Sequence, residues 1–168
     1  MYLTLAAAGA AAVALLEVTL WPYLGAAGTH LHPVFAGTVL LAGIGTLESG
    51  LAWAFAGGLM LDVLSPRPLG TTVLVLLLAT GTAAAAARAM AQIRIAVVAP
   101  IVIAFPLSLA YSLGIALILA AVEGSAPPRD AIPALVPGAI ADTVLVGLVM
   151  ALTLARRSRR EEQERVGW

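Results

Sequence analysis

The sequence lacks cysteine and lysine, and only 11% of its 168 residues are charged. Without cysteine, disulfides, thiolate metal sites and a cysteine nucleophile are excluded. Soluble domains carry about 25% charged residues, whereas this chain is 61% hydrophobic. Nucleic acid is also disfavoured as a partner, because the net charge is zero and no basic stripe precedes residue 156. The composition therefore indicates an integral membrane protein surrounded mostly by lipid.

Long apolar runs separated by short polar breaks predict an all-α fold, a polytopic bundle of six transmembrane helices. In hydrocarbon every backbone amide needs an internal partner, so apolar runs of about 20 residues form spanning helices. We expect residues 1–155 to form the bundle and residues 156–168 an arginine-rich cytoplasmic tail. The six expected spans are residues 2–20, 33–47, 50–64, 69–87, 95–122, and a last span from 133 or 137 to 155.

The prolines predict where helices end or bend, and the lengths of the two shortest spans bear on whether they cross the membrane. We expect Pro22 to end the first helix, and Pro100 and Pro106 to bend the fifth. The second and third spans contain 15 residues each, and a helix of that length reaches about 22 Å, less than the roughly 30 Å hydrocarbon core. A re-entrant hairpin is therefore an alternative for this pair.

The distribution of arginines predicts the orientation. With six spans and both termini in the cytoplasm, Arg88, Arg94 and the five tail arginines lie inside, and only Arg67 and Arg129 lie outside. Short positively charged segments are retained in the cytoplasm, so this bias favours cytoplasmic termini. The tail itself could anchor the topology and contact anionic lipid, or it could dock a cytoplasmic partner.

Asp62 lies at a position where a charged carboxylate is energetically unfavourable. It falls in the last turn of the third expected helix, near the negative end of the helix dipole and near the membrane, and both effects oppose its charged form. Either Arg67, five residues later, or free N–H groups at the start of the fourth helix could compensate. Asp62 could tie this helix to the following turn, dock a partner, or handle protons or ions.

Small residues recur at helical spacing on the same predicted helix. Together they form a smooth strip that lets a neighbouring helix approach closely. Such a strip is a feature of helix assembly, and together with Arg67 it offers a possible contact with a partner protein. The strip consists of Gly50, Ala54, Gly57 and Gly58.

Two further acids, Glu17 and Asp142, lie within the first and sixth expected spans. An acid inside the membrane suggests a functional site, but no arginine lies near either residue in the sequence. Asp142 follows Pro137-Gly138 closely and is expected at the outer boundary, facing water. For both acids we expect boundary solvation or hydrogen bonding between helices.

The sequence shows no constellation that indicates catalysis or a bound cofactor. His30 and His32 could supply two metal ligands, but a stable site needs a third and a fourth. Ser65 and Ser108 have no histidine or lysine base in a recognisable local arrangement. We therefore expect neither enzymatic activity nor a resident metal or cofactor.

Residues 57–70 resemble a motif of the MreD family, which consists of bacterial rod-shape-determining membrane proteins. Chain length, the all-helical layout and the arginine-rich C-terminal end agree with this resemblance. Members often carry a polar amide in the last helix, whereas this chain has Asp142 there. The matching residues are Gly57, Gly58, Asp62, Leu64-Ser65-Pro66 and Pro68-Leu69-Gly70, followed by an apolar helix.

The resemblance implies a noncatalytic component of the cell-elongation machinery in the bacterial inner membrane. Its partners would be MreC, the MreB filament system, and the glycosyltransferase and transpeptidase that build lateral peptidoglycan. It also implies a six-helix arrangement similar to the substrate-binding subunits of energy-coupling-factor transporters, so a vitamin-like binding subunit is the alternative. Such a subunit needs a pocket with convergent polar groups, whereas this chain has few polar side chains and neither Lys nor Asn. This contrast favours the scaffold.

Overall fold

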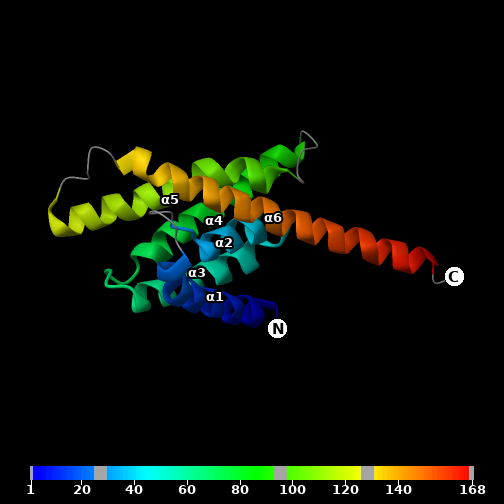
Figure 1. The fold of residues 1–168 in the computed structure, drawn as a ribbon, viewed down its shortest axis with the longest axis horizontal. Coiled ribbons are helices and arrows are strands. Elements are labelled where there is room, and N and C mark those ends of the chain that lie inside the picture. Colours follow the sequence, from blue (N-terminus) through cyan, green and yellow to red (C-terminus); the bar gives the residue numbers. More distant parts are fainter. Residues whose placement is uncertain (1, 25–29, 93–97, 126–130, 167–168) are drawn as a thin grey trace.

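The computed structural model describes residues 2–24, 30–92, 98–125 and 131–166, and all regular structure in these residues is helical. The chain alternates in direction from helix to helix, so α1 begins and α6 ends toward the same end of the bundle (Figure 1). The elements are α1 (Tyr2–Leu24), α2 (Pro33–Ile44), α3 (Leu47–Leu64), α4 (Thr71–Gln92), α5 (Ala99–Glu123) and α6 (Ala131–Val166).

Five of these helices are long and apolar enough to cross a membrane. They are α3, α4, α5, the Tyr2–Leu20 part of α1 and the Pro133–Arg156 part of α6. This confirms the predicted helical membrane bundle and indicates a multi-pass membrane protein. The exception is α2, whose 12 residues correspond to about 18 Å of helix.

The short helix α2 lies at the centre of the bundle (Figure 1). It contacts all five other helices, and its residues Val34, Phe35 and Val39 are fully buried. Around it the other helices follow the order α1, α3, α4, α5, α6, each touching the next. Among the described residues α1 makes no contact with α5 or α6, so the ring is open between α1 and α6.

The strip of small residues on α3 lies inside this arrangement. A Cβ on Gly57 would lie 2.5 Å from Val34 of α2, and one on Gly58 would lie 2.8 Å from the Val73 backbone of α4. Gly50 faces α2 and α4 in the same way, and Ala54 is fully buried. The absence of side chains therefore lets α3 pack closely against its neighbours in this chain.

Three predicted boundaries in the first half of the chain are wrong: the end of the first helix, the end of the second and the start of the third. The second helix ends at Ile44 and not at residue 47. Helix α1 continues through Pro22 and ends two residues later, at Leu24, so the hydrogen bond that the missing Pro22 N–H cannot make does not end the helix at the proline itself. The third helix begins at Leu47 and has 18 residues, so of the pair expected to be short only α2 is short. A capping box begins it: Thr46 accepts the Ser49 N–H, and Ser49 accepts the Thr46 N–H.

The second half of the chain also departs from the prediction. Helix α4 extends to Gln92, so Arg88 is helical and not part of a connection. Pro100 stands in the first turn of α5, where a missing N–H costs nothing, so the bend expected there is wrong, whereas Pro106 lies inside the helix. Helix α6 runs from Ala131 through Pro137 and continues into the tail as far as Val166. Arg94 and Arg129, used to predict the orientation, lie outside the described residues.

Candidate functional site

The shortness of α2 leaves a cavity at one end of the bundle. Because α2 begins only at Pro33, the described part of the chain has no helix filling the space between the ends of α1, α3, α5 and α6. The cavity has a volume of about 590 Å³, within the range of small-molecule sites. The polar and aromatic part of its lining consists of Glu17, His30, His32, Ser65, Arg67, Tyr111 and Ser112.

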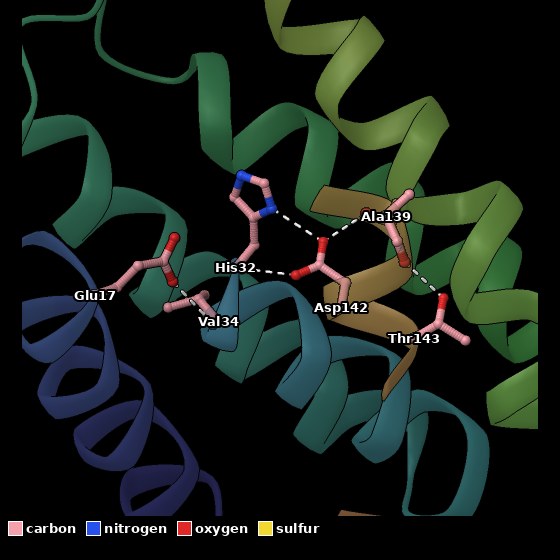
Figure 2. Close-up of polar contacts among 7 residues, drawn as sticks. Glu17, His32, Val34, Ala139, Asp142 and Thr143 are labelled. Carbon is pink, nitrogen blue, oxygen red and sulfur yellow. Dashed lines mark hydrogen bonds and ion pairs between the residues drawn. The ribbon is translucent and has the colours of Figure 1, made fainter. Parts of the chain in front are cut away.

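Asp142 of α6 is fully buried beside this cavity. Its Oδ1 accepts the backbone N–H of His32 at 2.7 Å, and its Oδ2 lies 3.0 Å from His32 Nδ1 (Figure 2). The same Oδ2 accepts the Ser108 hydroxyl at 2.5 Å. The expectation that Asp142 faces water is therefore wrong. Instead it forms the alternative that we expected, hydrogen bonds between helices, and it joins the start of α2 to α5 and α6.

The ring of His32 is coupled to the same carboxylate. Burial by itself lowers the pKa of His32, but the hydrogen bond and the negative charge of Asp142, helped by the charge of Glu17, outweigh it. The pKa of His32 is therefore raised above its ordinary value of 6.5. When His32 is protonated it forms an ion pair with Asp142 across 3.0 Å.

Glu17 of α1 supplies a second acid to the start of α2. Its Oε2 accepts the Val34 N–H at 3.0 Å, and Figure 2 shows Glu17 and Asp142 on opposite sides of the first turn of α2. The first N–H groups of a helix have no partner inside the helix, and they attract negative charge. His32 makes no capping hydrogen bond with its own side chain, so acids from α1 and α6 perform this role.

Asp62 has a similar role at the start of α4. It is buried, its Oδ2 accepts the Gly70 N–H at 2.8 Å, and its Oδ1 accepts the Thr72 N–H at 2.9 Å. The Val73 N–H lies farther away, 3.4 Å from Oδ2. Of the two compensating groups that we expected, the N–H groups of the fourth helix are the ones present. In the described part of the chain Arg67 forms no ion pair with Asp62.

The turn between α3 and α4 explains the remaining residues of the motif. Ser65 ends α3 in an extended conformation and donates its N–H to the Leu61 carbonyl at 3.0 Å. The Thr71 N–H is 3.3 Å from the Pro68 carbonyl, and Pro66 is exposed. Gly70 has a φ of 94°, which side-chain-bearing residues rarely adopt. Glycine is therefore needed where the chain turns back to present its N–H to Asp62.

Ser108, His32 and Asp142 are the residue types of a hydrolase triad, but they meet in the wrong order. In a triad the serine donates to the histidine, and the aspartate orients that histidine. Here the buried Ser108 hydroxyl donates to the aspartate itself. The arrangement can hold three helices together, but it cannot activate the serine. Nor do the described residues contain a group of three or more His, Cys, Asp or Glu side chains that could hold a metal ion.

Tyr111 is a cavity residue that the sequence reasoning missed. Its ring packs edge-on against His32 at 5.3 Å between centroids and stacks on Phe35 at 5.1 Å. The residue is 2% exposed, yet its hydroxyl has no hydrogen-bond partner among the described residues. Buried tyrosine hydroxyls usually find a partner, so a tyrosine within the apolar run of the fifth span was the available signal.

Of the three residues expected to contact a partner protein, two are buried in the structure and one is exposed. Gly50 and Ala54 are buried between helices of this chain, so the close approach that they permit is already used within the bundle. Arg67 is exposed and lines the cavity. Of the three, only Arg67 is accessible to another molecule.

Comparison with known proteins assigns this chain to no family and gives it no function. The sequence matches no protein-family model and no curated protein, and no solved structure matches the chain. The resemblance to the MreD family and the similarity to energy-coupling-factor subunits therefore stay predictions, and the function is a matter of proposal.

Proposed function

We propose that this protein is a noncatalytic scaffold of the bacterial cell-elongation machinery, as its resemblance to the MreD family implies. In this proposal it lies in the inner membrane, binds MreC, and thereby supports the MreB filament system and the synthases of lateral peptidoglycan. One observation carries the proposal: the residues of the resemblance build a single structural unit. Asp62, Gly70 and the Gly57-Gly58 pair all serve the close junction of α3 with its neighbours.

A scaffold needs a firm interior and an apolar outer surface that other helices can contact. The buried acids Asp62 and Asp142 supply interhelical hydrogen bonds inside the bundle. On the outside of α3, three large apolar side chains follow one another at intervals of four residues, which places them on one helix face. We call this face the α3 ridge; it consists of Phe55, Leu59 and Val63, and all three are exposed.

The test is capture of MreC from membranes of a rod-shaped bacterium. We expect Gly58→Leu to reduce both MreC capture and rod shape, because the added side chain would meet the α4 backbone. Gly81→Leu is the matched control, since a Cβ at Gly81 has open space. Replacing the α3 ridge with alanines should leave the purified protein folded but weaken MreC capture. Capture at the wild-type level with normal cell width, for both Gly58→Leu and the ridge variant, would contradict the scaffold.

Six crossings, with both termini in the cytoplasm, complete this proposal. The alternating direction of the helices supports it, because α1 begins and α6 ends toward the same end of the bundle (Figure 1). The short helix α2 contacts all five longer helices, so it need not match the hydrocarbon thickness. A topology reporter fused to each terminus should give the same side for both, and opposite sides would refute the six-crossing scheme.

The cavity favours a second candidate, the vitamin-like binding subunit of a membrane transporter. Too few polar side chains were expected for a pocket, but several converge there, including Glu17, His32, Arg67 and Tyr111. These groups come from separate parts of the chain, so their convergence depends on the fold. Extraction of the purified protein should yield a stoichiometric water-soluble compound if this candidate is correct. Its absence, with MreC retained, would favour the scaffold.

A further inference from the structure

The cavity has both polar and apolar lining residues. Its polar groups include Glu17 from α1, Arg67 from the turn after α3 and Tyr111 from α5. Ile115 and Leu119 of α5 and Leu135 of α6 also line it. A cavity with both kinds of lining suits an amphiphile better than a wholly polar solute, because an amphiphile can place each of its parts against residues of matching polarity.

In the described part of the chain, the cavity also lies beside the open seam between α1 and α6. Among the described residues α1 contacts only α2 and α3, whereas Val18 of α1 and Leu135 of α6 both line the cavity. Outside it, Leu16 and Leu20 of α1 are about half exposed. In a membrane protein such apolar surface faces lipid. A ligand with hydrocarbon chains could therefore place its polar end in the cavity while its chains leave between α1 and α6.

Three polar groups at the cavity have unused hydrogen-bonding capacity within the described chain. Glu17 uses only Oε2, which accepts the Val34 N–H. The hydroxyl of the buried Tyr111 has no partner in residues 2–24, 30–92, 98–125 or 131–166, and neither does the guanidinium of Arg67. Although Glu17 and Arg67 have opposite charges, no ion pair joins them in this part of the chain. Both side chains line the same cavity, so each is open to a bound molecule.

These groups differ in what they can bind. A guanidinium matches the oxygens of a phosphate and donates hydrogen bonds to them. The free Glu17 oxygen and the Tyr111 hydroxyl accept hydrogen bonds, which a primary ammonium donates but a quaternary ammonium cannot. The combination therefore selects a phosphate and a primary ammonium in the same headgroup.

We propose that the cavity binds the headgroup of an aminophospholipid such as phosphatidylethanolamine. Its phosphate lies at Arg67, its ammonium at Glu17 and Tyr111, and its acyl chains pass between α1 and α6. This inference holds whether or not the protein is a scaffold. It differs from the vitamin-like candidate because the bound molecule is a membrane lipid and not a transported solute.

The test is native mass spectrometry of the full-length protein with defined lipids added at equal concentration. We expect phosphatidylethanolamine to be retained in preference to phosphatidylcholine and phosphatidylglycerol. Glu17→Gln should reduce this preference by about tenfold, the effect of one charge-assisted hydrogen bond. Tyr111→Phe should reduce it less, and Arg67→Gln should weaken retention of all three lipids. Glu48→Gln and Arg88→Gln are the matched controls, since both residues are exposed and lie away from the cavity.

Other outcomes would overturn the inference. Equal retention of the three lipids would show that the cavity does not recognise the ammonium group. A preference for phosphatidylethanolamine that survives in Glu17→Gln would show the same. Free phosphoethanolamine that competes as well as the intact lipid would show that the seam between α1 and α6 is not used. A variant that fails to purify as a monodisperse species is replaced by Glu17→Asp, which should keep the preference if the carboxylate provides it.

Discussion

Gly58 provides the sharpest test of how α3 and α4 are joined. In the variant Gly58→Ala, the new Cβ would lie 2.8 Å from Val73 Cα and 3.0 Å from Val73 N. Both atoms belong to the backbone, so no side-chain rotation can relieve the contact. Helix α4 would have to move away, and with it the Val73 and Thr72 N–H groups that point at Asp62.

The expected loss follows from two opposing effects. Overfilling a packed interior costs about 1–3 kcal/mol, whereas replacing glycine by alanine inside a helix gains roughly 0.5–1 kcal/mol. The net effect is a loss of up to about 2.5 kcal/mol, which corresponds to a melting temperature lower by up to about 10 °C for a domain of this size. The control Gly81→Ala has no atom within 4 Å of its new Cβ, so only the gain should remain.

Thermal unfolding in detergent, followed by circular dichroism and by the monodisperse fraction after heating, measures this difference. Gly147→Ala serves as a second control, because its Cβ also has open space. We expect Gly58→Ala to melt below the wild type and both controls to melt at or above it. If Gly58→Ala melts as high as Gly81→Ala, the close approach of α3 to α4 does not depend on the missing side chain, and the reasoning fails.

Three further predictions concern polar groups. The buried Thr72 hydroxyl has no partner within the described residues, so Thr72→Val should raise stability by about 1 kcal/mol in thermal unfolding; a lower melting temperature would reveal a hidden partner. Asp62→Asn exchanges one acceptor oxygen for an amide that cannot accept the Gly70 or Thr72 N–H, and should cost about 1–3 kcal/mol. Unchanged stability, with slow hydrogen exchange retained at Thr72, would contradict this role. Because the folded-state pKa of His32 lies above 6.5, its pairing with Asp142 stabilises the fold fully below that pH and is lost as the pH rises through the raised pKa. Melting temperature should therefore fall over this range in the wild type but not in His32→Gln, and an equal fall in both would exclude His32 as the cause.

Features that depend on neighbouring residues could be predicted from the sequence. Apolar runs predict spanning helices because backbone groups in lipid must be satisfied within the helix itself. The environment of Asp62 was similarly accessible, since its partner Gly70 is only eight residues away. The length of α3 was within reach too, because Thr46 and Ser49 form a capping box. The prediction went wrong where a proline was taken to end or bend a helix, as at Pro22 and Pro100, because its effect depends on the turn in which it stands.

Only the tertiary structure decided how the remaining polar residues are used. Asp142 and His32 are 110 residues apart, and nothing in the residues around either one identifies the other. The central place of α2 depends on contacts with all five other helices, and the cavity exists because this central helix is short. By itself the sequence determined that the chain forms apolar helices, since that requirement acts within each helix. Which acids, rings and hydroxyls meet was decided by packing between helices, because packing brings together groups that the chain order keeps apart.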